Sequence, residues 1–190
     1  MEKNLTQQPI DGLIKVVCFG PESTGKTTLV KALSAHYQTH WVEEYMRAYF
    51  EKKWKGEKGT STIEDLMPIA LGQMASENQK AQVSDKLLFC DTDLLQLKVY
   101  SQAYFNEFCP PEIEKYALQN QYDLYFLMAI DIPWEEDNLR DKPQEREAMY
   151  ERFKRELEQQ NKPFIVLEGD FNQRFEKAQR EIENLIKRQS

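Results

Sequence analysis

Residues 20–28 of this 190-residue chain read GPESTGKTT and directly follow the apolar run LIKVVCF of residues 13–19. The stretch matches the pattern G-x-x-x-x-G-K-[ST], with Lys26 and Thr27 in its last two places. Gly20 and Gly25 let the backbone curl, so that successive N–H groups point inward at phosphate oxygens. A helix that begins near Lys26 adds the positive end of its dipole. We therefore predict a phosphate-binding loop, the P-loop, between a buried strand and a helix.

The side chains of the loop have predicted roles toward a nucleotide and its cation. Lys26 is expected to reach the β and γ phosphates, and Thr27 to offer its hydroxyl to Mg²⁺. The expected nucleotide-binding residues are Gly20, Pro21, Glu22, Ser23, Thr24, Gly25, Lys26, Thr27 and Thr28. Because backbone amides carry no formal charge, such a cradle is compatible with an acidic protein.

A second acidic group is needed near the loop, since Thr27 alone cannot hold a cation that prefers several oxygen ligands. The run KLLFCDTD of residues 86–93 places Asp91 directly after four apolar residues, with Asp93 two positions later on the same side of the chain. We predict a metal role for Asp91. The alternative is that Asp91 caps the helix that starts near Leu94, and for Asp93 the two interpretations are equally balanced.

Outward from the loop, apolar runs alternate with helical patterns along the whole chain, which is typical of βαβ units. We predict an α/β fold of the P-loop type, a parallel five-stranded sheet flanked by helices, with a lid as in nucleoside and nucleotide kinases. The predicted strands are residues 13–19, 39–42, 86–90, 123–130 and 163–167. The predicted helices are residues 26–35, 44–52, 61–84, 94–105, a short one after 110–111, 143–160 and 172–187. The stretch S-T-I-E, Ser61 to Glu64, is interpreted as a capping box at the start of the longest helix.

Composition bounds the cellular role. The chain carries 25 Lys plus Arg against 32 Asp plus Glu, a net charge of -7, which disfavours nucleic acid or an anionic membrane surface as the main partner. Its length fits one domain with residues 1–12 as an N-terminal tail. Its three cysteines, one of them Cys18, show no metal-ligand spacing and are expected to be reduced thiols of a cytoplasmic protein. No apolar run suits a signal peptide or a membrane span.

Other classes of P-loop protein fit less well. A GTPase needs N-K-x-D to read guanine, but residues 161–164 read NKPF and no D-x-x-G follows the loop. Mechanical ATPases of the AAA type need a larger module and a helical lid. A small-molecule kinase is therefore the leading prediction, acting on a nucleoside-like hydroxyl. The alternatives are a nucleotide-dependent binding module and a P-loop ATPase with another acceptor.

A kinase also needs an acceptor pocket with a base. After the second strand the chain reads VEEYMRAY, residues 42–49, at the edge where open α/β sheets bind ligands. We predict that Glu43, Glu44, Tyr45, Arg47 and Asp93 bind the acceptor. Glu44 is the expected catalytic base, with Glu43 and Asp93 as other candidates for the base. The alternative is a solvated helix start.

A lid and an adenine contact complete the predicted site. Residues 131–146, DIPWEEDNLRDKPQER, suit a lid whose Arg140 and Arg146 stabilise the transferring phosphoryl group, while Trp134 contacts the acceptor. The alternative is an ordinary charged connection. In residues 168–175, EGDFNQRF, either Arg174 or Phe171 is expected to stack on the adenine, and core packing is an equally balanced alternative for Phe171.

Together these stretches resemble the NadR-type ribosylnicotinamide kinase domain, a P-loop kinase grouped with AAA-like ATPases that phosphorylates the 5′ hydroxyl of nicotinamide riboside. The matching stretches are GPESTGKTTLVKAL, VEEYMRAY, ALGQ (70–73), FCDTDLLQLK, YDLYFLMAIDIPWEEDNLRD and GDFNQRFEKA. The resemblance implies ATP and Mg²⁺ as cofactors, Asp91 as the acidic strand-end residue, Arg140 in the lid, and Glu43 or Glu44 as the acid facing the substrate.

Two departures from that family stand out. Its full-length members often carry an adenylyltransferase domain, sometimes with a helix-turn-helix, and neither fits in the twelve residues before Leu13. The family is also expected to grip the nicotinamide ring between aromatic side chains. Glu43 stands where one of these is expected, and Trp41, Tyr45 or Trp134 are the candidate substitutes.

Overall fold

The computed structural model describes residues 4–55, 59–133 and 145–189. Its sheet has the strand order β2-β3-β1-β4-β5, and every neighbouring pair is parallel. The strands are β1 Ile14–Phe19, β2 Trp41–Val42, β3 Leu87–Asp91, β4 Leu124–Met128 and β5 Phe164–Leu167. The helices are α1 Lys26–His36, α2 Tyr45–Trp54, α3 Ile63–Val83, α4 Leu94–Tyr104, α5 Pro111–Gln119, α6 Arg146–Gln159 and α7 Phe171–Gln189. The predicted parallel five-stranded sheet flanked by helices is confirmed.

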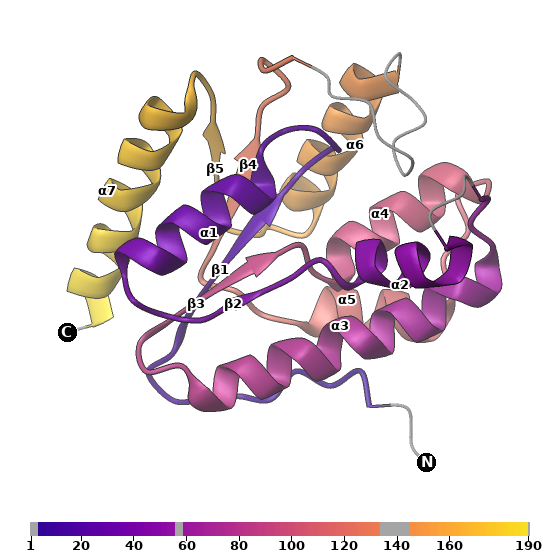
Figure 1. The fold of residues 1–190 in the computed structure, drawn as a ribbon, viewed down its shortest axis with the longest axis horizontal. Coiled ribbons are helices and arrows are strands. Elements are labelled where there is room, and N and C mark those ends of the chain that lie inside the picture. The colour runs from indigo at the N-terminus through magenta and orange to yellow at the C-terminus, as the bar shows by residue number, and fades with distance from the viewer. Residues whose placement is uncertain (1–3, 56–58, 134–144, 190) are drawn as a thin grey trace.

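The helices cover both faces of the sheet (Figure 1). Alternate residues of each buried strand point to opposite faces. On one face Val16 and Phe126 pack with Leu29 and Val30 of α1 and Ile182 of α7. The opposite face packs against α3, α4, α5 and α6, and its strand residues are Val17, Phe19, Leu88, Cys90, Tyr125 and Leu127. Burial on both faces explains why the strands are continuous apolar runs rather than alternating ones.

The order of the strands places the ends of β1 and β3 side by side. Cys18 of β1 is opposite Asp91 of β3, and the backbone N–H of Thr92 donates to the carbonyl of Cys18 at 3.2 Å. β1 also pairs with β4 on its other side, so the chain leaves β1 at the point where the strand order reverses. Open α/β sheets bind ligands at such a point.

The start of α3 differs by one residue from the prediction. Thr62 is the N-cap, and Asp65 completes the capping box, in place of Ser61 and Glu64. The Asp65 carboxylate accepts from the Thr62 backbone N–H at 2.9 Å. The Asp65 side chain reaches back to the N-cap, and it also accepts hydrogen bonds from Tyr49 and Lys53. These tertiary contacts favour Thr62 over Ser61 as the first residue of the capping box.

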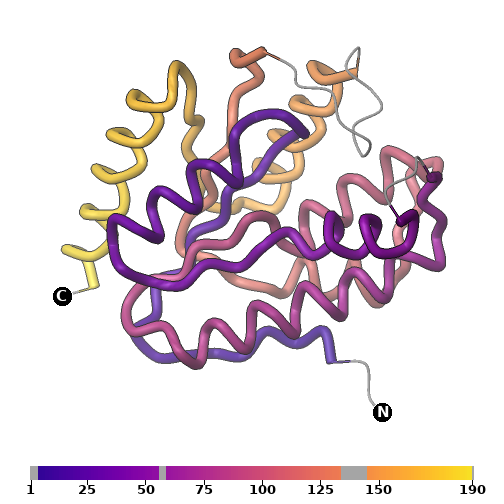
Figure 2. The backbone as a smooth tube through the Cα atoms, viewed as in Figure 1, coloured from indigo at the N-terminus to yellow at the C-terminus, as the bar shows by residue number. Residues whose placement is uncertain are grey.

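The segment before β1 is not a free tail in its described part. Residues 4–12 run alongside α3 (Figure 2), and Leu5 is fully buried in the core. The side chain of Gln7 donates to Glu77 at 2.8 Å, and the backbone N–H of Gln8 donates to the side-chain oxygen of Asn78 at 2.8 Å. These bonds continue the fold onto the outer side of α3.

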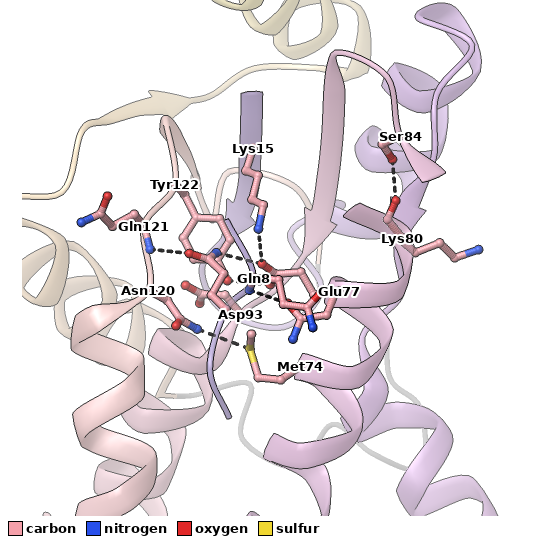
Figure 3. A network of polar contacts seen from close by, with 12 residues as sticks. Gln8, Lys15, Met74, Glu77, Lys80, Ser84, Asp93, Asn120, Gln121 and Tyr122 are labelled. Carbon is pink, nitrogen blue, oxygen red and sulfur yellow. Dashed lines mark hydrogen bonds and ion pairs between the residues drawn. The ribbon is translucent and has the colours of Figure 1, made fainter. Parts of the chain in front are cut away.

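A buried polar network joins this segment to the sheet (Figure 3). The Glu77 carboxylate accepts from Lys15 Nζ at 3.2 Å and from the Tyr122 hydroxyl at 2.7 Å, in addition to Gln7. Burying a carboxylate is costly unless its oxygens are paired, and here three donors satisfy it. The network fixes α3 against β1 and the approach to β4.

In the described parts of the chain we find no helix that is both long and apolar enough to cross a membrane.

Candidate active site

The loop of residues 20–28 joins β1 to α1 and has the backbone geometry that its glycines permit. Gly20 and Gly25 have φ angles of 134° and 81°. A Cβ atom on Gly20 would lie 3.2 Å from the carbonyl oxygen of Met128, so a side chain there would press on the end of β4. Gly25 is the N-cap of α1, whose first residue is Lys26. The N–H groups of the first helical turn thus face the cradle, as anion binding requires.

Lys26 folds back over its own loop. Its ammonium donates to the carbonyl oxygens of Gly20 at 2.9 Å and Pro21 at 2.7 Å, and the residue is buried. Both contacts are with backbone acceptors at the mouth of the cradle. A phosphate oxygen that enters the cradle offers the same ammonium a charged acceptor in their place, and a charge-assisted hydrogen bond is the stronger one.

Thr27 and Asp91 meet as the sequence predicted. The Thr27 hydroxyl donates to Oδ2 of Asp91, a fully buried carboxylate. Burial raises the pKa of Asp91, and the nearby Lys26 opposes that rise. Within the described residues, Oδ1 of Asp91 has no hydrogen-bond partner. The capping alternative is wrong, because the N-cap of α4 is Asp93.

This pair fits a magnesium ion. Mg²⁺ prefers hard oxygen donors and takes few of them from protein, keeping waters and phosphate oxygens for the rest of its shell. Thr27 Oγ1 and the unpaired Oδ1 of Asp91 are two such donors at the edge of the cradle. Over the described ranges no cluster of three or more His, Cys, Asp or Glu side chains is placed to hold a metal.

A cavity of about 600 Å³ opens from the loop toward α2, α3 and α4. At one end lies the loop itself, from Glu22 to Thr28. The far end, which we call the acceptor arm, is lined by Met46, Phe50, Trp54, Thr60, Ser61, Thr62, Asp65, Leu66, Ile69, Leu97, Tyr100, Ser101, Tyr104 and Phe105. Glu44, Arg47, Gly59, Ile132 and Pro133 complete the lining. The volume suits a small ligand in addition to phosphate groups.

Five aromatic side chains line the acceptor arm, and the sequence predictions do not include them. Phe50 and Trp54 of α2 are stacked, with ring centroids 4.3 Å apart and an interplanar angle of 15°. Tyr100 and Tyr104 of α4 line the cavity as well. The available signal was the spacing of four residues within each pair, which places both rings on one face of a helix. That spacing is equally typical of a core stripe, and only the opposed helices make it a pocket wall.

The buried carboxylate of Asp65 lines the arm and links α3 to α2. Asp65 accepts from the Lys53 ammonium at 2.6 Å and from the Tyr49 hydroxyl at 2.7 Å. Burial alone would raise the pKa of Asp65, but these hydrogen bonds and the one from Thr62 outweigh it and lower the pKa below its usual value. The hydrogen bond between the Tyr49 hydroxyl and Asp65 raises the pKa of Tyr49. The anchor fixes the helix that carries Phe50 and Trp54.

The residues predicted after β2 separate into two groups. Glu44, the N-cap of α2, and Arg47 line the cavity, and the positive charge of Arg47 acts to lower the pKa of Asp91. Glu43 is exposed and does not belong to the lining. Tyr45 is 37% exposed and lies over Gly72 of α3, where a Cβ would approach its ring to 2.1 Å. The structure therefore favours Glu44 over Glu43 and gives Tyr45 a packing position.

Asp93 lies behind the cavity rather than in it. Its carboxylate accepts from the backbone N–H of Gln96 at 2.9 Å and from the Tyr125 hydroxyl at 2.8 Å. Burial raises its pKa to about 7. The predicted role in acceptor binding does not match this position, because the side chain turns into the core to start α4. Thr92, which lies between Asp91 and Asp93 in the chain, has a positive φ of 76°. The two aspartates on either side of it have different hydrogen-bond partners.

The predicted lid is described only at its ends. Trp134 and Arg140 lie outside the described residues. Arg146, at the start of α6, donates to the carbonyl of Ser23 at 3.3 Å and to that of Ile132 at 3.1 Å. Its guanidinium thus reaches the phosphate loop, and burial lowers its pKa.

Arg174 lies beneath the loop and not on an open face. It is 3% exposed, and its guanidinium donates to the carbonyls of Thr24 at 2.6 Å, Gly169 at 2.9 Å and Ala129 at 3.2 Å. It is also paired with Asp131. The predicted contact of Arg174 with the adenine does not match this buried position. Arg174 instead supports the loop from below through its bond to Thr24, and we call it the Arg174 strut. Phe171, the other candidate, is exposed and stacks on Phe175.

Solved structures share this fold. A crystal structure of NadR protein in complex with NR superposes with a TM-score of 0.72 at 22% identity, covering 91% of this chain and 51% of that chain. A deoxyadenosine kinase from M. mycoides superposes with a TM-score of 0.66 at 16% identity, covering 90% of this chain and 100% of that chain. The chain therefore shares its fold with these NadR and deoxyadenosine kinase structures.

Sequence comparison gives relatives of the same kind. The trifunctional NAD biosynthesis/regulator proteins NadR of Salmonella typhimurium and Escherichia coli are each 28% identical over 163 residues, 84% of this chain. The chain spans only 40% of the length of these two relatives. A family model described as an AAA domain matches residues 15–174, which include the phosphate loop, Asp91 and the Arg174 strut. With this match over most of its length, the chain belongs to that AAA domain family of P-loop proteins.

Proposed function

We propose that this protein is an ATP-dependent kinase that transfers the γ-phosphoryl group to the hydroxyl of a nucleoside-like acceptor, with nicotinamide riboside as the first candidate. The observation that carries the proposal is the single cavity that has the phosphate loop at one end and an aromatic arm at the other. A nucleoside has the same division, because its sugar hydroxyl must approach the phosphate while its flat base needs an apolar slot. The NadR and deoxyadenosine kinase likenesses support this assignment.

The donor end supplies binding and charge. The amides of the loop and the first turn of α1 hold the β and γ phosphates, and Lys26 leaves the Gly20 and Pro21 carbonyls for phosphate oxygens. Arg146, already bonded to the loop at Ser23, supplies positive charge to the transferring group. Arg174 holds the loop from below through Thr24. These groups act mainly by position and electrostatics, as phosphoryl transfer requires.

The acceptor end positions the nucleophile. Glu44 lines the same cavity and is the N-cap of the helix that carries Phe50 and Trp54. In this proposal, an acceptor whose ring lies against Phe50 and Trp54 presents its hydroxyl near the Glu44 carboxylate. Glu44 accepts the hydroxyl proton as the acceptor oxygen attacks the γ phosphorus. Arg47 is placed to bond the sugar or the transferred phosphate. The walls of the arm exclude water that would otherwise compete as acceptor.

Magnesium is the proposed cofactor alongside ATP. Thr27 and Asp91 would hold it, and when bound it supplies positive charge to the β and γ phosphate oxygens. The chain's own part is to keep the Asp91 carboxylate ionised, for which Lys26 and Arg47 lie nearby.

Acceptor-stimulated turnover tests the proposal. The protein is incubated with ATP and MgCl₂ and a panel of ribosides, nicotinamide riboside first, while ADP release and the phosphorylated product are followed. We expect ADP release to rise with one class of riboside and to match product one to one. ATP binding with slow hydrolysis that no riboside stimulates would contradict the kinase and favour a nucleotide-dependent binding module.

A further inference from the structure

Two buried glutamines hold the starting residues of the two substrate-binding segments. Gln73 of α3 accepts, through its side-chain oxygen, the backbone N–H of Tyr45 at 2.9 Å, where α2 begins. Gln96 of α4 accepts in the same way the backbone N–H of Gly20 at 3.2 Å, where the phosphate loop begins. The two residues are 4% and 2% exposed. One glutamine thus serves the acceptor side and the other serves the donor side.

These bonds replace caps that the local sequence does not supply. The first N–H groups of a helix have no partner inside it, and the N-cap Glu44 makes no side-chain capping bond to α2. Gln73 fills that place from a different helix. Gln96 is itself fixed, because Asp93 accepts its backbone N–H and is held in turn by Tyr125.

The two glutamines also share a small cavity. Gln73 and Gln96 line one small cavity of about 10 Å³, which Glu44 lines as well. Within the described part of the chain, neither Gln73 Nε2 nor Gln96 Nε2 has a hydrogen-bond partner. A buried amide nitrogen without an acceptor is costly, and two in one cavity call for a shared acceptor. A space of this size with several polar groups holds one water molecule.

We propose that Gln73 and Gln96 are a pair of positioning residues, linked through one buried water between their amide nitrogens, that set the spacing between Glu44 and the phosphate loop. Neither residue of the pair belongs to the lining of the large cavity. The pair acts through α2 on one side and through Gly20 on the other. Transfer of a phosphoryl group is sensitive to such spacing, because a displacement of about 1 Å can lower the rate about a hundredfold. This inference rests on the proposed function for its kinetic consequences, and its structural part does not.

Substitution by methionine tests the link, because methionine has a similar length and loses both the oxygen and the amide nitrogen. We expect Gln73→Met and Gln96→Met each to lower kcat about tenfold, with the larger rise in KM for the acceptor in the first and for ATP in the second. The double variant should lose less than the product of the two single losses, since either substitution alone already removes the shared water. Gln82→Met on α3 and Gln102→Met on α4 are the matched controls.

Hydrogen exchange of backbone amides gives a readout that does not need activity. With the shared water, Gln73→Met speeds exchange at Tyr45 and also at Gly20, and Gln96→Met speeds exchange at the same two amides. Exchange that rises only at the directly bonded amide, or a double variant with the product of the two single losses, would overturn the link. If the wild type transfers no phosphoryl group at all, the proposed function fails while the exchange experiment still decides this inference.

Discussion

The two ends of the cavity are built in different ways. The phosphate cradle comes from one continuous stretch, residues 20–28, and its binding groups are mostly backbone amides set by two glycines and a helix start. The acceptor arm is assembled from side chains of α2, α3 and α4, which are far apart in the sequence. A local device of the first kind leaves a strict motif, whereas the second leaves only helical spacing. The difference also predicts which kinetic constant each end controls.

Removal of the cradle's ammonium should have the largest effect. We expect Lys26→Ala to lower kcat about a thousandfold, because it deletes a buried charge aimed at the transferring phosphoryl group while leaving the loop backbone in place. The measurement is steady-state kinetics at saturating acceptor, with Lys31→Ala on the exposed side of α1 as the control. An unchanged acceptor KM would sharpen the division, and near-normal turnover would remove Lys26 from the mechanism.

The strand-end carboxylate comes next. Asp91→Asn keeps the size of the side chain and an acceptor for Thr27 but loses the charge. We expect kcat to fall about a hundredfold and the Mg²⁺ concentration for half-maximal rate to rise. Magnesium titrations at fixed ATP give both numbers. A variant with the wild-type dependence on magnesium would break the assignment of Asp91 to the cradle.

Truncation of the stacked ring probes the opposite end. Trp54→Ala removes one wall of the acceptor arm, and we expect the acceptor KM to rise about tenfold with the KM for ATP unchanged. Phe108→Ala is the matched control, since Phe108 is an exposed aromatic residue outside the cavity lining. An equal rise in both KM values would show that the two ends are not independent.

The smallest effect is expected at the anchor of the arm. Asp65→Asn loses the charge that pairs with Lys53, and we expect a stability loss of about 1 kcal/mol at pH 7. Because the pKa of Asp65 is lowered in the folded state, its contribution is present above the unfolded value of 3.8 and is lost as the pH falls through the lower folded value. The free energies of unfolding of both proteins, measured with urea, should therefore begin to converge as the pH falls below about 4 and should meet once it is below the folded pKa of Asp65. A gap that persists at acid pH would contradict a charge-based anchor.

The sequence predicted most of the fold because its signals are local. All five strands are mainly apolar runs, three of them buried throughout, and the observed ends lie within two residues of the predicted ones. The predicted meeting of Thr27 and Asp91 is confirmed because parallel strands end at the same edge of a sheet. The capping box at α3 was misplaced by one residue, since Ser61 and Thr62 are both acceptable caps and a distant Lys53 favours Asp65.

The candidate site was predicted unevenly for a physical reason. Glu44 and Arg47 were found because they follow a strand, but the same rule also selected Glu43, which the start of α2 leaves exposed. The sequence predicts that Arg174 contacts the nucleotide, but the side chain is buried under the loop. That burial depends on the packing of α7 against α1, which the sequence of α7 alone does not show. The aromatic wall was missed because a stripe of rings on one helix does not reveal what it faces.

By itself the sequence determined the phosphate loop, the parallel sheet and an acidic partner at the end of β3, and it showed how a net charge of -7 is compatible with phosphate binding. These features depend on backbone geometry, on burial and on neighbours along the chain. Only the tertiary structure decided which carboxylates face the cavity, which rings form the acceptor arm and which glutamines hold the two ends together. Those choices depend on side chains from separate helices meeting in space, and the periodicity of one helix carries no record of its partner.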